Sequence, residues 1–382
     1  MKKILLILLT IALIGISCRD EKEIIDSEEI IVAPPDPTRT IKGFYLLNES
    51  NMGMNKASLD YYDYGTGIYT RNIFASANPT VVKEMGDVGN DLKIYGGKLY
   101  AVINCSNKID VMDKLTAKKV GQIEVPNCRY IRFHEGYAYV TSYAGPVQIV
   151  PNYEQIGYVA KIDTTTLQVV DRCFVGYQPD ELEIVGEKIY VANSGGYMVP
   201  NYENTVSVID IATFTETKRI EIANNLHRLR ADAYGNLWVS SRGDYYDEPS
   251  RLYWVDLSIE KMVGFIDIAV SNFHIDGDSL YLYSVEWSYE TMSNRITYGI
   301  VDVIKKELLT RNFITDGTDQ EIKTPYGLIV NPITKDIYVT DARNSVLPGT
   351  LYCFDKEGRR KWSVRTGDVP AHFAFLEEYV TE

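Results

Sequence analysis

The sequence lacks an excess of basic residues. Its 382 residues include 39 Lys and Arg against 52 Asp and Glu, which gives a formal net charge of −13. Neutralising the phosphates of a nucleic acid requires clustered Lys and Arg side chains, so this balance argues against a nucleic-acid-binding protein. An acidic surface of this kind mainly favours solubility.

The sequence also has few residues that could support catalytic or metal chemistry. None of its four histidines lies at metal-ligand spacing from a second His or Cys, and it contains no nucleophile elbow, P-loop, dinucleotide fingerprint or EF-hand loop. We therefore expect a binding protein without metal or cofactor rather than an enzyme. A catalytic site assembled from single residues of distant segments stays open as an alternative.

Apolar runs are short even where the sequence is most apolar, at its start. Lys2 and Lys3 precede an apolar run over residues 4–16, which predicts a signal peptide over residues 1–17. Because the run is short for spanning a bilayer, a lipid anchor is favoured over a transmembrane anchor. Ser17 followed by Cys18 resembles the lipobox of bacterial lipoproteins, which implies that Cys18 is lipidated.

Residues 18–40 are charged and end in a Pro-rich stretch, so we expect a flexible tether there. Acidic residues directly after the lipidated Cys resemble the surface-export signal of lipoproteins in Gram-negative gut anaerobes. That resemblance implies an outer-membrane protein exposed on the cell surface, with a plain solvated linker as the alternative.

A short apolar strand, a polar loop and a second strand that ends in Asp occur seven times between residues 41 and 382. The aromatic residues of the first strands lie 39 to 57 residues apart: Tyr45, Tyr100, Tyr139, Tyr190, Trp238, Tyr281 and Tyr338. A repeat of this length built only of strands predicts an all-β fold, a seven-bladed β-propeller. The second strands end at Asp63, Asp113, Asp163, Asp210, Asp256, Asp302 and Asp355. These Asp residues precede turns, so we expect them to cap turns rather than bind metal.

Each repeat except the first has a further strand ahead of its aromatic strand. A strand of the same kind, residues 371–376, follows the last repeat. We therefore expect the C-terminal strand to complete the first blade and close the ring, which removes exposed sheet edges. The inner strands carry Lys93, Arg132, Glu183, Arg230 and His274 at equivalent positions. These side chains either approach the central axis or, as we favour, form ion pairs between blades.

The loops between the aromatic strand and the Asp-terminated strand of the blades are long and aromatic, and they should share one face of the ring. A Val-Pro-Asn-Tyr-Glu segment occurs in two of them, at 150–154 and 199–203. Tyr, Trp and amide side chains on one face suit a flat or amphipathic ligand, whereas the alternative is that the loops pack on themselves. The residues that we expect to contact a ligand are Asn51, Met52, Tyr143, Asn152, Tyr153, Tyr197, Asn201, Tyr202, Tyr245, Tyr246, Trp287 and Tyr289.

Four cysteines remain after Cys18. Cys105 and Cys128 should lie on this same face of neighbouring blades, close enough for a disulfide in an oxidising compartment; free thiols are the equal alternative. Cys173 and Cys353 fall within predicted strands, and we expect them to be buried singly.

The repeats resemble the YncE-like surface propellers in their Tyr-Val-Ala-Asn and Val-Ile-Asp strands, here Tyr190–Asn193 and Val208–Asp210. The signal sequence, the opening strand with Asn51-Met-Gly-Met54, and the Tyr-rich loops also look like the BtuG-type surface lipoproteins. That resemblance implies capture of cobalamin (vitamin B12) as a transported ligand and its delivery to a TonB-dependent outer-membrane transporter. A glycan-binding or adhesion lipoprotein is the main alternative, and a propeller lyase or hydrolase is the third.

Overall fold

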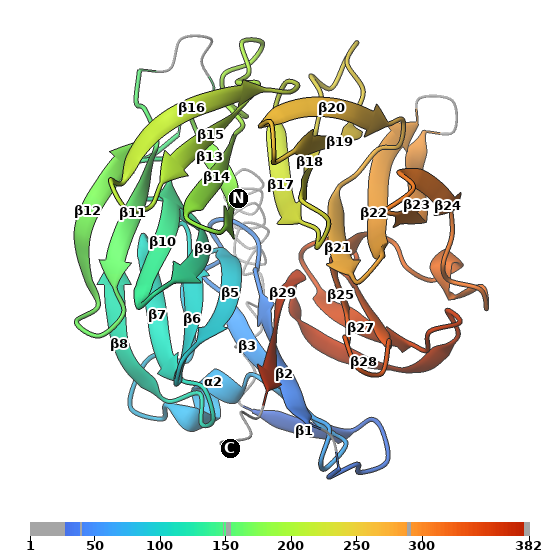
Figure 1. The fold of residues 1–382 in the computed structure, drawn as a ribbon. Coiled ribbons are helices and arrows are strands. Elements are labelled where there is room, and N and C mark those ends of the chain that lie inside the picture. Colours follow the sequence, from blue (N-terminus) through green and yellow to red (C-terminus); the bar gives the residue numbers. More distant parts are fainter. Residues whose placement is uncertain (1–26, 39, 148, 150–153, 289–291, 378–382) are drawn as a thin grey trace, which may run out of the picture.

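The computed structural model describes residues 27–38, 40–147, 149, 154–288 and 292–377, with only the backbone for Trp287 and Ser288. Within these ranges the chain forms a ring of seven antiparallel sheets around a central channel (Figure 1). This arrangement confirms the predicted seven-bladed β-propeller. The predicted signal peptide and Cys18 lie outside the described residues.

The strands of each blade follow one another from the channel outward. Blade 1 contains β29 (Pro370–Glu377), β2 (Ile41–Asn48), β3 (Ser58–Asp63), β4 (Ile68–Arg71) and β1 (Glu28–Ile31). Blade 2 contains β5 (Gly89–Tyr95), β6 (Lys98–Ile103), β7 (Lys108–Asp113) and β8 (Lys119–Glu124), and blade 3 contains β9 (Cys128–His134), β10 (Tyr137–Ser142), β11 (Tyr158–Asp163) and β12 (Gln168–Phe174). Blade 4 contains β13 (Pro179–Val185), β14 (Lys188–Asn193), β15 (Thr205–Asp210) and β16 (Thr215–Glu221). Blade 5 contains β17 (Leu226–Ala231), β18 (Asn236–Ser241), β19 (Arg251–Asp256) and β20 (Lys261–Ile266); blade 6 contains β21 (Asn272–Asp276), β22 (Ser279–Ser288), β23 (Ser293–Asp302) and β24 (Glu307–Thr310); blade 7 contains β25 (Pro325–Val330), β26 (Ile337–Asp341), β27 (Pro348–Phe354) and β28 (Arg360–Asp368).

Two short helices lie in the links between blades. Helix α2 (Ile73–Ala77) precedes blade 2, and the 3-10 helix η1 (Thr318–Gln320) precedes blade 7. None of the helices in the described part of the chain is long and apolar enough to span a membrane.

The ring closes in blade 1 through the C-terminal strand. β29 is the innermost strand of this blade and pairs antiparallel with β2, with Tyr45 opposite Ala374 and Phe44 opposite Phe375. The prediction that residues 371–376 complete the first blade is therefore confirmed.

Blade 1 also differs from the prediction at its outer edge. We expected residues 18–40 to form a flexible tether, but β1 pairs with β4, so Ile30 lies opposite Tyr69. Beyond β1, the backbone N–H of Val32 donates to Gly67 and that of Asp36 donates to Tyr64. The prediction was wrong for these residues because Ile30 and Val32 pack against the apolar cluster between blades 7 and 1.

Apolar side chains fill each of the seven interfaces between neighbouring blades. The aromatic residues of the second strands lie in these interfaces, and all but the half-buried Tyr281 are buried. Because Tyr, Trp and branched aliphatic side chains suit the pleated face of a strand, one sequence pattern produces every interface. The interfaces hold the seven inner strands in fixed positions around the channel.

The seven Asp residues that end the third strands cap the turns that follow them, as predicted. In each case a carboxylate oxygen accepts a hydrogen bond from a backbone N–H two to four residues ahead. In Asp113, for example, Oδ1 accepts from the N–H groups of Leu115 and Thr116 at 3.1 and 2.9 Å. The carboxylate and the backbone N–H groups thus find their hydrogen-bond partners within the same turn, so a short turn is sufficient.

Candidate functional site

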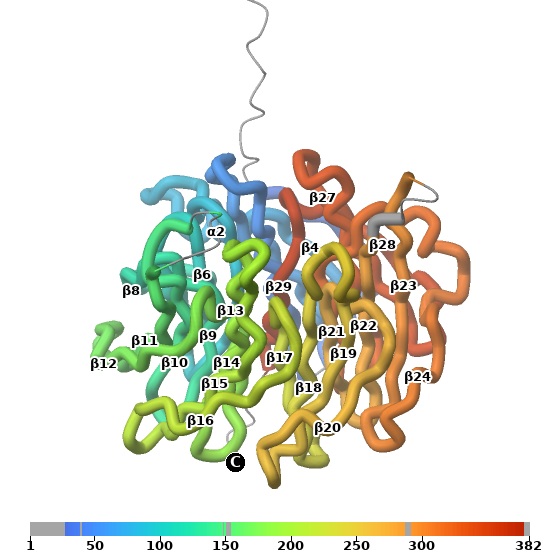
Figure 2. Tube along the Cα trace, turned by 90° about the horizontal axis from the view of Figure 1, so that it is seen from above, coloured from blue at the N-terminus to red at the C-terminus, as the bar shows by residue number. Residues whose placement is uncertain are grey.

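The two faces of the ring differ in their connections. On the face that we call the loop face, the second and third strands of each blade are joined and the chain passes to the next blade; the other face, the turn face, carries the Asp-capped turns. Figure 2 shows the ring from the side, with the two faces at its upper and lower edges. Large exposed apolar side chains on the connections of the loop face are Met52, Val81, Val82, Ile149, Ile156, Tyr245, Tyr246, Met292, Val346 and Leu347.

Aromatic contacts join the loops of blades 3, 4 and 5 on this face. The rings of Tyr143 and Tyr197 meet edge to face with centroids 6.5 Å apart, and those of Tyr202 and Tyr245 do so at 6.4 Å. Tyr245 is 64% exposed and its neighbour Tyr246 is 83% exposed. Two Tyr pairs therefore join the loops of blades 3, 4 and 5, and we call this group the Tyr rim; Tyr245 and Tyr246 at its edge are open to solvent.

The predicted ligand residues do not all join this rim. Asn51 and the exposed Met52 lie on blade 1, which blade 2 separates from blade 3. Asn201 is exposed on the loop of blade 4 that also carries Tyr197 and Tyr202. Asn152, Tyr153 and Tyr289 lie outside the described residues, and the backbone of Trp287 belongs to β22.

Tyr143 supports the rim from below instead of facing solvent. It is only 4% exposed, and its hydroxyl donates a 2.8 Å hydrogen bond to Asp180 Oδ1. Burial raises the pKa of Tyr143 well above its ordinary value, so the phenol stays protonated and can donate. The predicted ligand contact of Tyr143 finds no support in this position, because its hydroxyl already bonds to Asp180.

Asp180 lies at the centre of a buried group that we call the Asp180 cluster: Arg129, Tyr143, Asp180 and Arg242. The carboxylate of Asp180 is fully buried and receives Arg129 at 3.1 Å and Arg242 at 3.0 Å. Burial alone would raise the pKa of Asp180, but the two arginines hold it below its usual range. The carboxylate thus stays charged and links blades 3, 4 and 5 beneath the rim.

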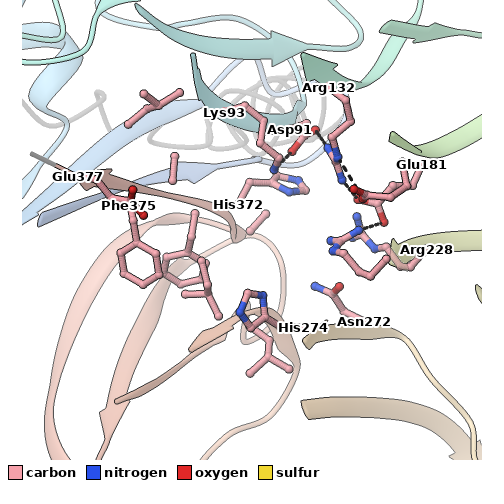
Figure 3. Close-up of a pocket in the computed structure, with 18 of the residues that line it drawn as sticks. Asp91, Lys93, Arg132, Glu181, Arg228, Asn272, His274, His372, Phe375 and Glu377 are labelled. Carbon is pink, nitrogen blue, oxygen red and sulfur yellow. Dashed lines mark hydrogen bonds and ion pairs between the residues drawn. The ribbon is translucent and has the colours of Figure 1, made fainter. Parts of the chain in front are cut away.

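A cavity of about 440 Å³ lies in the central channel. On one side it is lined by charged side chains of blades 2 to 5, which come from β5, β9, β13 and β17 (Figure 3). The carboxylate of Asp91 contacts Lys93 at 2.9 Å and Arg132 at 3.1 Å. Glu181 contacts Arg132 at 2.8 Å and also pairs with Arg230.

Both alternatives for the equivalent inner-strand residues are thus realised together. Lys93, Arg132, Glu183, Arg230 and His274 line the cavity. Arg132, Glu183 and Arg230 form ion pairs between blades, whereas Lys93 pairs with Asp91 of its own strand. Burial would raise the pKa of Glu181, but Arg230 and Arg132 bring it down to about 2. Glu181 is consequently ionised at neutral pH.

The other side of the cavity is formed by blades 6, 7 and 1 and is mostly uncharged. Leu328 and Phe373 line it together with His274 and His372. Burial and, to a smaller extent, the nearby cations Arg230 and Lys93 together lower the pKa of His274 to about 3. Burial also lowers the pKa of His372, so both imidazoles are neutral at pH 7.

A repeated backbone irregularity brings these polar side chains to the channel. In β9, β13, β17 and β25 the inner strand has one residue more than its partner near the loop face, which is a β-bulge. A hydroxyl from the second strand binds a backbone N–H within each of three bulges: Thr141 at Tyr130, Ser240 at Arg228 and Thr340 at Gly327. The bulge turns consecutive residues such as Asp180 and Glu181 toward the interior of the ring.

The cysteines differ in part from the prediction. Cys105, Cys128, Cys173 and Cys353 form no disulfide with one another, so the Cys105–Cys128 bridge is absent. The Cys128 thiol turns inward and donates to the carbonyl of Lys108 at 3.4 Å, while the Cys105 thiol donates to Asn104 Oδ1 at 3.3 Å. Cys173 and Cys353 are buried, as predicted.

The sequence analysis did not name several residues that line the cavity or form the ion pairs around it. Asp91, Glu181 and Arg228 lie two residues before Lys93, Glu183 and Arg230, so strand alternation would have placed them toward the channel as well. Arg129 and Asp180 gave no such signal, because the bulges interrupt the alternation at that point.

The protein is therefore a seven-bladed propeller in which the inner strands of the blades line a polar central cavity. The chain belongs to the family described as a domain of unknown function, DUF5074, whose model matches residues 42–375. No curated protein matches the chain.

Solved structures share the fold at low sequence identity. One is a quinonprotein alcohol dehydrogenase-like protein from Bacteroides thetaiotaomicron, with a TM-score of 0.56 and 14% identity over 88% of this chain and 79% of that one. Another is the hydrazine synthase of Kuenenia stuttgartiensis, with a TM-score of 0.54 and 16% identity over 70% of this chain and 77% of that one. At such identities the likeness concerns the fold alone.

Proposed function

We propose that the protein is a surface lipoprotein that binds cobalamin on its loop face and passes it to a TonB-dependent outer-membrane transporter. The observation that carries a binding role is the Tyr rim over blades 3 to 5, in which Tyr202 and Tyr245 meet across two blades. On the turn face the connections are short, locally capped turns.

The rim has the chemistry that a broad amphipathic ligand requires. Tyr rings supply apolar contact area with few rotatable bonds, and their hydroxyls fix orientation by hydrogen bonds. The Asp180 cluster holds the loops of the rim in place from below, so these loops lose little conformational entropy when a ligand binds. A corrin ring is flat and edged with amides, and such a rim could hold its periphery without a ligand to cobalt.

The resemblance to BtuG-type lipoproteins supports cobalamin as the ligand and a TonB-dependent transporter as the partner. The opening strand β2 with Asn48 and Glu49, followed by Asn51-Met-Gly-Met54, belongs to that likeness. Because β1 begins at Glu28, a tether from Cys18 would comprise residues 19–27 and span at most about 30 Å when fully extended. The propeller would therefore stay close to the membrane surface to which we propose it is anchored.

Calorimetry with cyanocobalamin and with a panel of glycans tests the ligand. We expect saturable binding of cyanocobalamin at micromolar protein and no heat from the glycans. Glycan binding without cobalamin binding would favour the adhesion lipoprotein instead. Absence of both would contradict a role for the rim in either.

A substitution pair tests the position of the site. Replacing Tyr245 and Tyr246 together by Ala should weaken cyanocobalamin binding by roughly tenfold or more, because exposed Tyr residues commonly anchor a ligand. Tyr234→Ala is the matched control, since Tyr234 is 50% exposed but lies on the turn face. Equal affinities of the double variant and the control would move the site away from this rim.

A further inference from the structure

The central cavity contains one buried arginine without a carboxylate partner among the described residues. Arg228 is 8% exposed, lines the cavity, and its Nε has no hydrogen-bond partner. Its guanidinium lies 5.2 Å from the centre of the Tyr130 ring. Figure 3 shows it at the cavity wall near Glu181 and Asn272.

The nearby carboxylates are already occupied by other groups. Glu181 receives Arg132, Arg230 and the backbone N–H of Leu229, the last at 3.1 Å. Asp180 is shared by Arg129 and Arg242. Glu49, on blade 1, lies 3.8 Å from Nε2 of the neutral His372 and forms no ion pair with Arg228 in the described part of the chain. The positive charge of Arg228 is therefore left over when the ion pairs of this region are assigned.

Arg228 is nevertheless held in its charged form. Burial opposes the charge, but Tyr130 and Glu181 raise the pKa of Arg228 above its ordinary value. A buried cation of this kind is costly unless a hydrogen-bonding anion completes it. Two neutral groups line the cavity beside it: Asn272, whose Nδ2 donates one hydrogen bond to the Tyr326 carbonyl at 3.3 Å and has a second N–H, and the uncharged imidazole of His274.

We propose that the channel contains a binding site for a small oxyanion, a carboxylate or a phosphate group, with Arg228 as its anchor and Asn272 and His274 as neighbouring donors. The planar guanidinium presents paired N–H groups that match two oxygens of one oxyanion, which a spherical halide does not offer. A cavity of about 440 Å³ is large enough for a small molecule that carries such a group. The site lies in the channel and does not depend on what binds the loop face.

Thermal unfolding of the full protein in phosphate, in acetate and in chloride at equal ionic strength tests the proposal. An anion that binds only the folded state raises the Tm as its concentration increases. We expect phosphate or acetate to raise the Tm of the wild type relative to chloride. A response to one of them identifies the oxyanion, and no response to either overturns the proposal.

Variants locate the site. Arg228→Met keeps an unbranched, flexible side chain and removes the guanidinium and its charge, so calorimetry should show oxyanion affinity weaker by roughly tenfold or more. Arg172→Met is the matched control, because Arg172 also lies over a Tyr ring, that of Tyr158 at 5.6 Å, but on the outer strand β12. Equal oxyanion affinity of the wild type and Arg228→Met overturns the proposal.

A charge-preserving variant keeps the test decisive even if Arg228→Met folds poorly. Arg228→Lys retains the charge but lacks the planar guanidinium, so it should bind the oxyanion more weakly than the wild type. Its Tm should still rise more in phosphate than in chloride. Unchanged affinity in Arg228→Lys would contradict recognition by the guanidinium.

Discussion

The two faces of the ring are built by the same seven repeats, yet they satisfy their polar groups in different ways. On the turn face, each Asp at the end of a third strand bonds to a backbone N–H within four residues of itself. On the loop face, Asp180 lies on blade 4, but the side chains that bond to its carboxylate come from blades 3 and 5.

This difference separates local from long-range polar contacts. A local contact stabilises one turn and tolerates change elsewhere in the ring, whereas the Asp180 cluster ties three blades together beneath the Tyr rim. We infer that, on the loop face, substitutions in the buried Asp180 cluster lower the stability of the protein more than substitutions at the exposed edge of the Tyr rim.

The largest expected effect is on Asp180. Asp180→Ala leaves Arg129 and Arg242 buried without their shared partner, so the free energy of unfolding should fall by about 3–5 kcal/mol. Asp113→Ala, which removes a local turn cap, should cost clearly less. Urea unfolding of both variants measures the difference, and equal losses would contradict the distinction between the faces.

The second largest effect is expected from acid, which should weaken the ion pairs of Glu181 in the wall of the central cavity. The folded pKa of Glu181, about 2, lies below its ordinary value of 4.5, because Arg230 and Arg132 outweigh the effect of burial. Ionised Glu181 therefore stabilises the fold above about pH 4.5, and this stabilisation is lost as the pH falls toward 2. Glu181→Gln should flatten the pH dependence of the urea midpoint in this range, and an unchanged slope would assign the acid sensitivity to other carboxylates.

A smaller effect is expected at the hydroxyls that bind the bulges. Thr141 Oγ1 accepts from the Tyr130 N–H at 3.1 Å and donates to the Asp180 carbonyl at 2.8 Å, so Thr141→Val should cost about 1–3 kcal/mol. Thr141→Ser should restore most of that loss. Thr164→Val on the turn face should cost less, because the Gly136 carbonyl that its hydroxyl binds also accepts the Thr164 N–H. Chemical unfolding of the three variants checks this order.

The smallest effect concerns the exposed edge of the rim. In a double-mutant cycle, Tyr202→Ala and Tyr245→Ala should show a coupling of about 0.5 kcal/mol, since one ring of the edge-to-face pair is largely exposed. A coupling above about 1.5 kcal/mol would mean that the rim contributes to the stability of the ring itself.

The features that the sequence made predictable are those encoded by nearby residues. The strands, the blade number, the Asp-capped turns and the closing strand β29 all follow from short repeated patterns. The position of Lys93 on its inner strand also pointed to Asp91 two residues earlier by simple alternation.

Other features depend on contacts between distant segments. The bulges in β9 and β13 change which residues face inward, so no local period placed Arg129 beside Asp180. Strand β1 has only four residues, and its pairing depends on the edge that β4 offers. For Cys105 and Cys128 the strand pattern gave their approximate place but not the separate hydrogen bonds of their thiols, to Asn104 Oδ1 and to the Lys108 carbonyl.

Blade 1 has a consequence for how the protein is made. Blades 2 to 7 consist of consecutive strands and can assemble as each segment leaves the ribosome, but blade 1 needs β2 and β29. More than 300 residues separate Tyr45 from its partner Ala374. Throughout synthesis the inner edge of β2 therefore stays unpaired, and a premature stop before Pro370 would leave an open arc that exposes two apolar blade faces. Chaperone demand should accordingly be greatest just before translation ends.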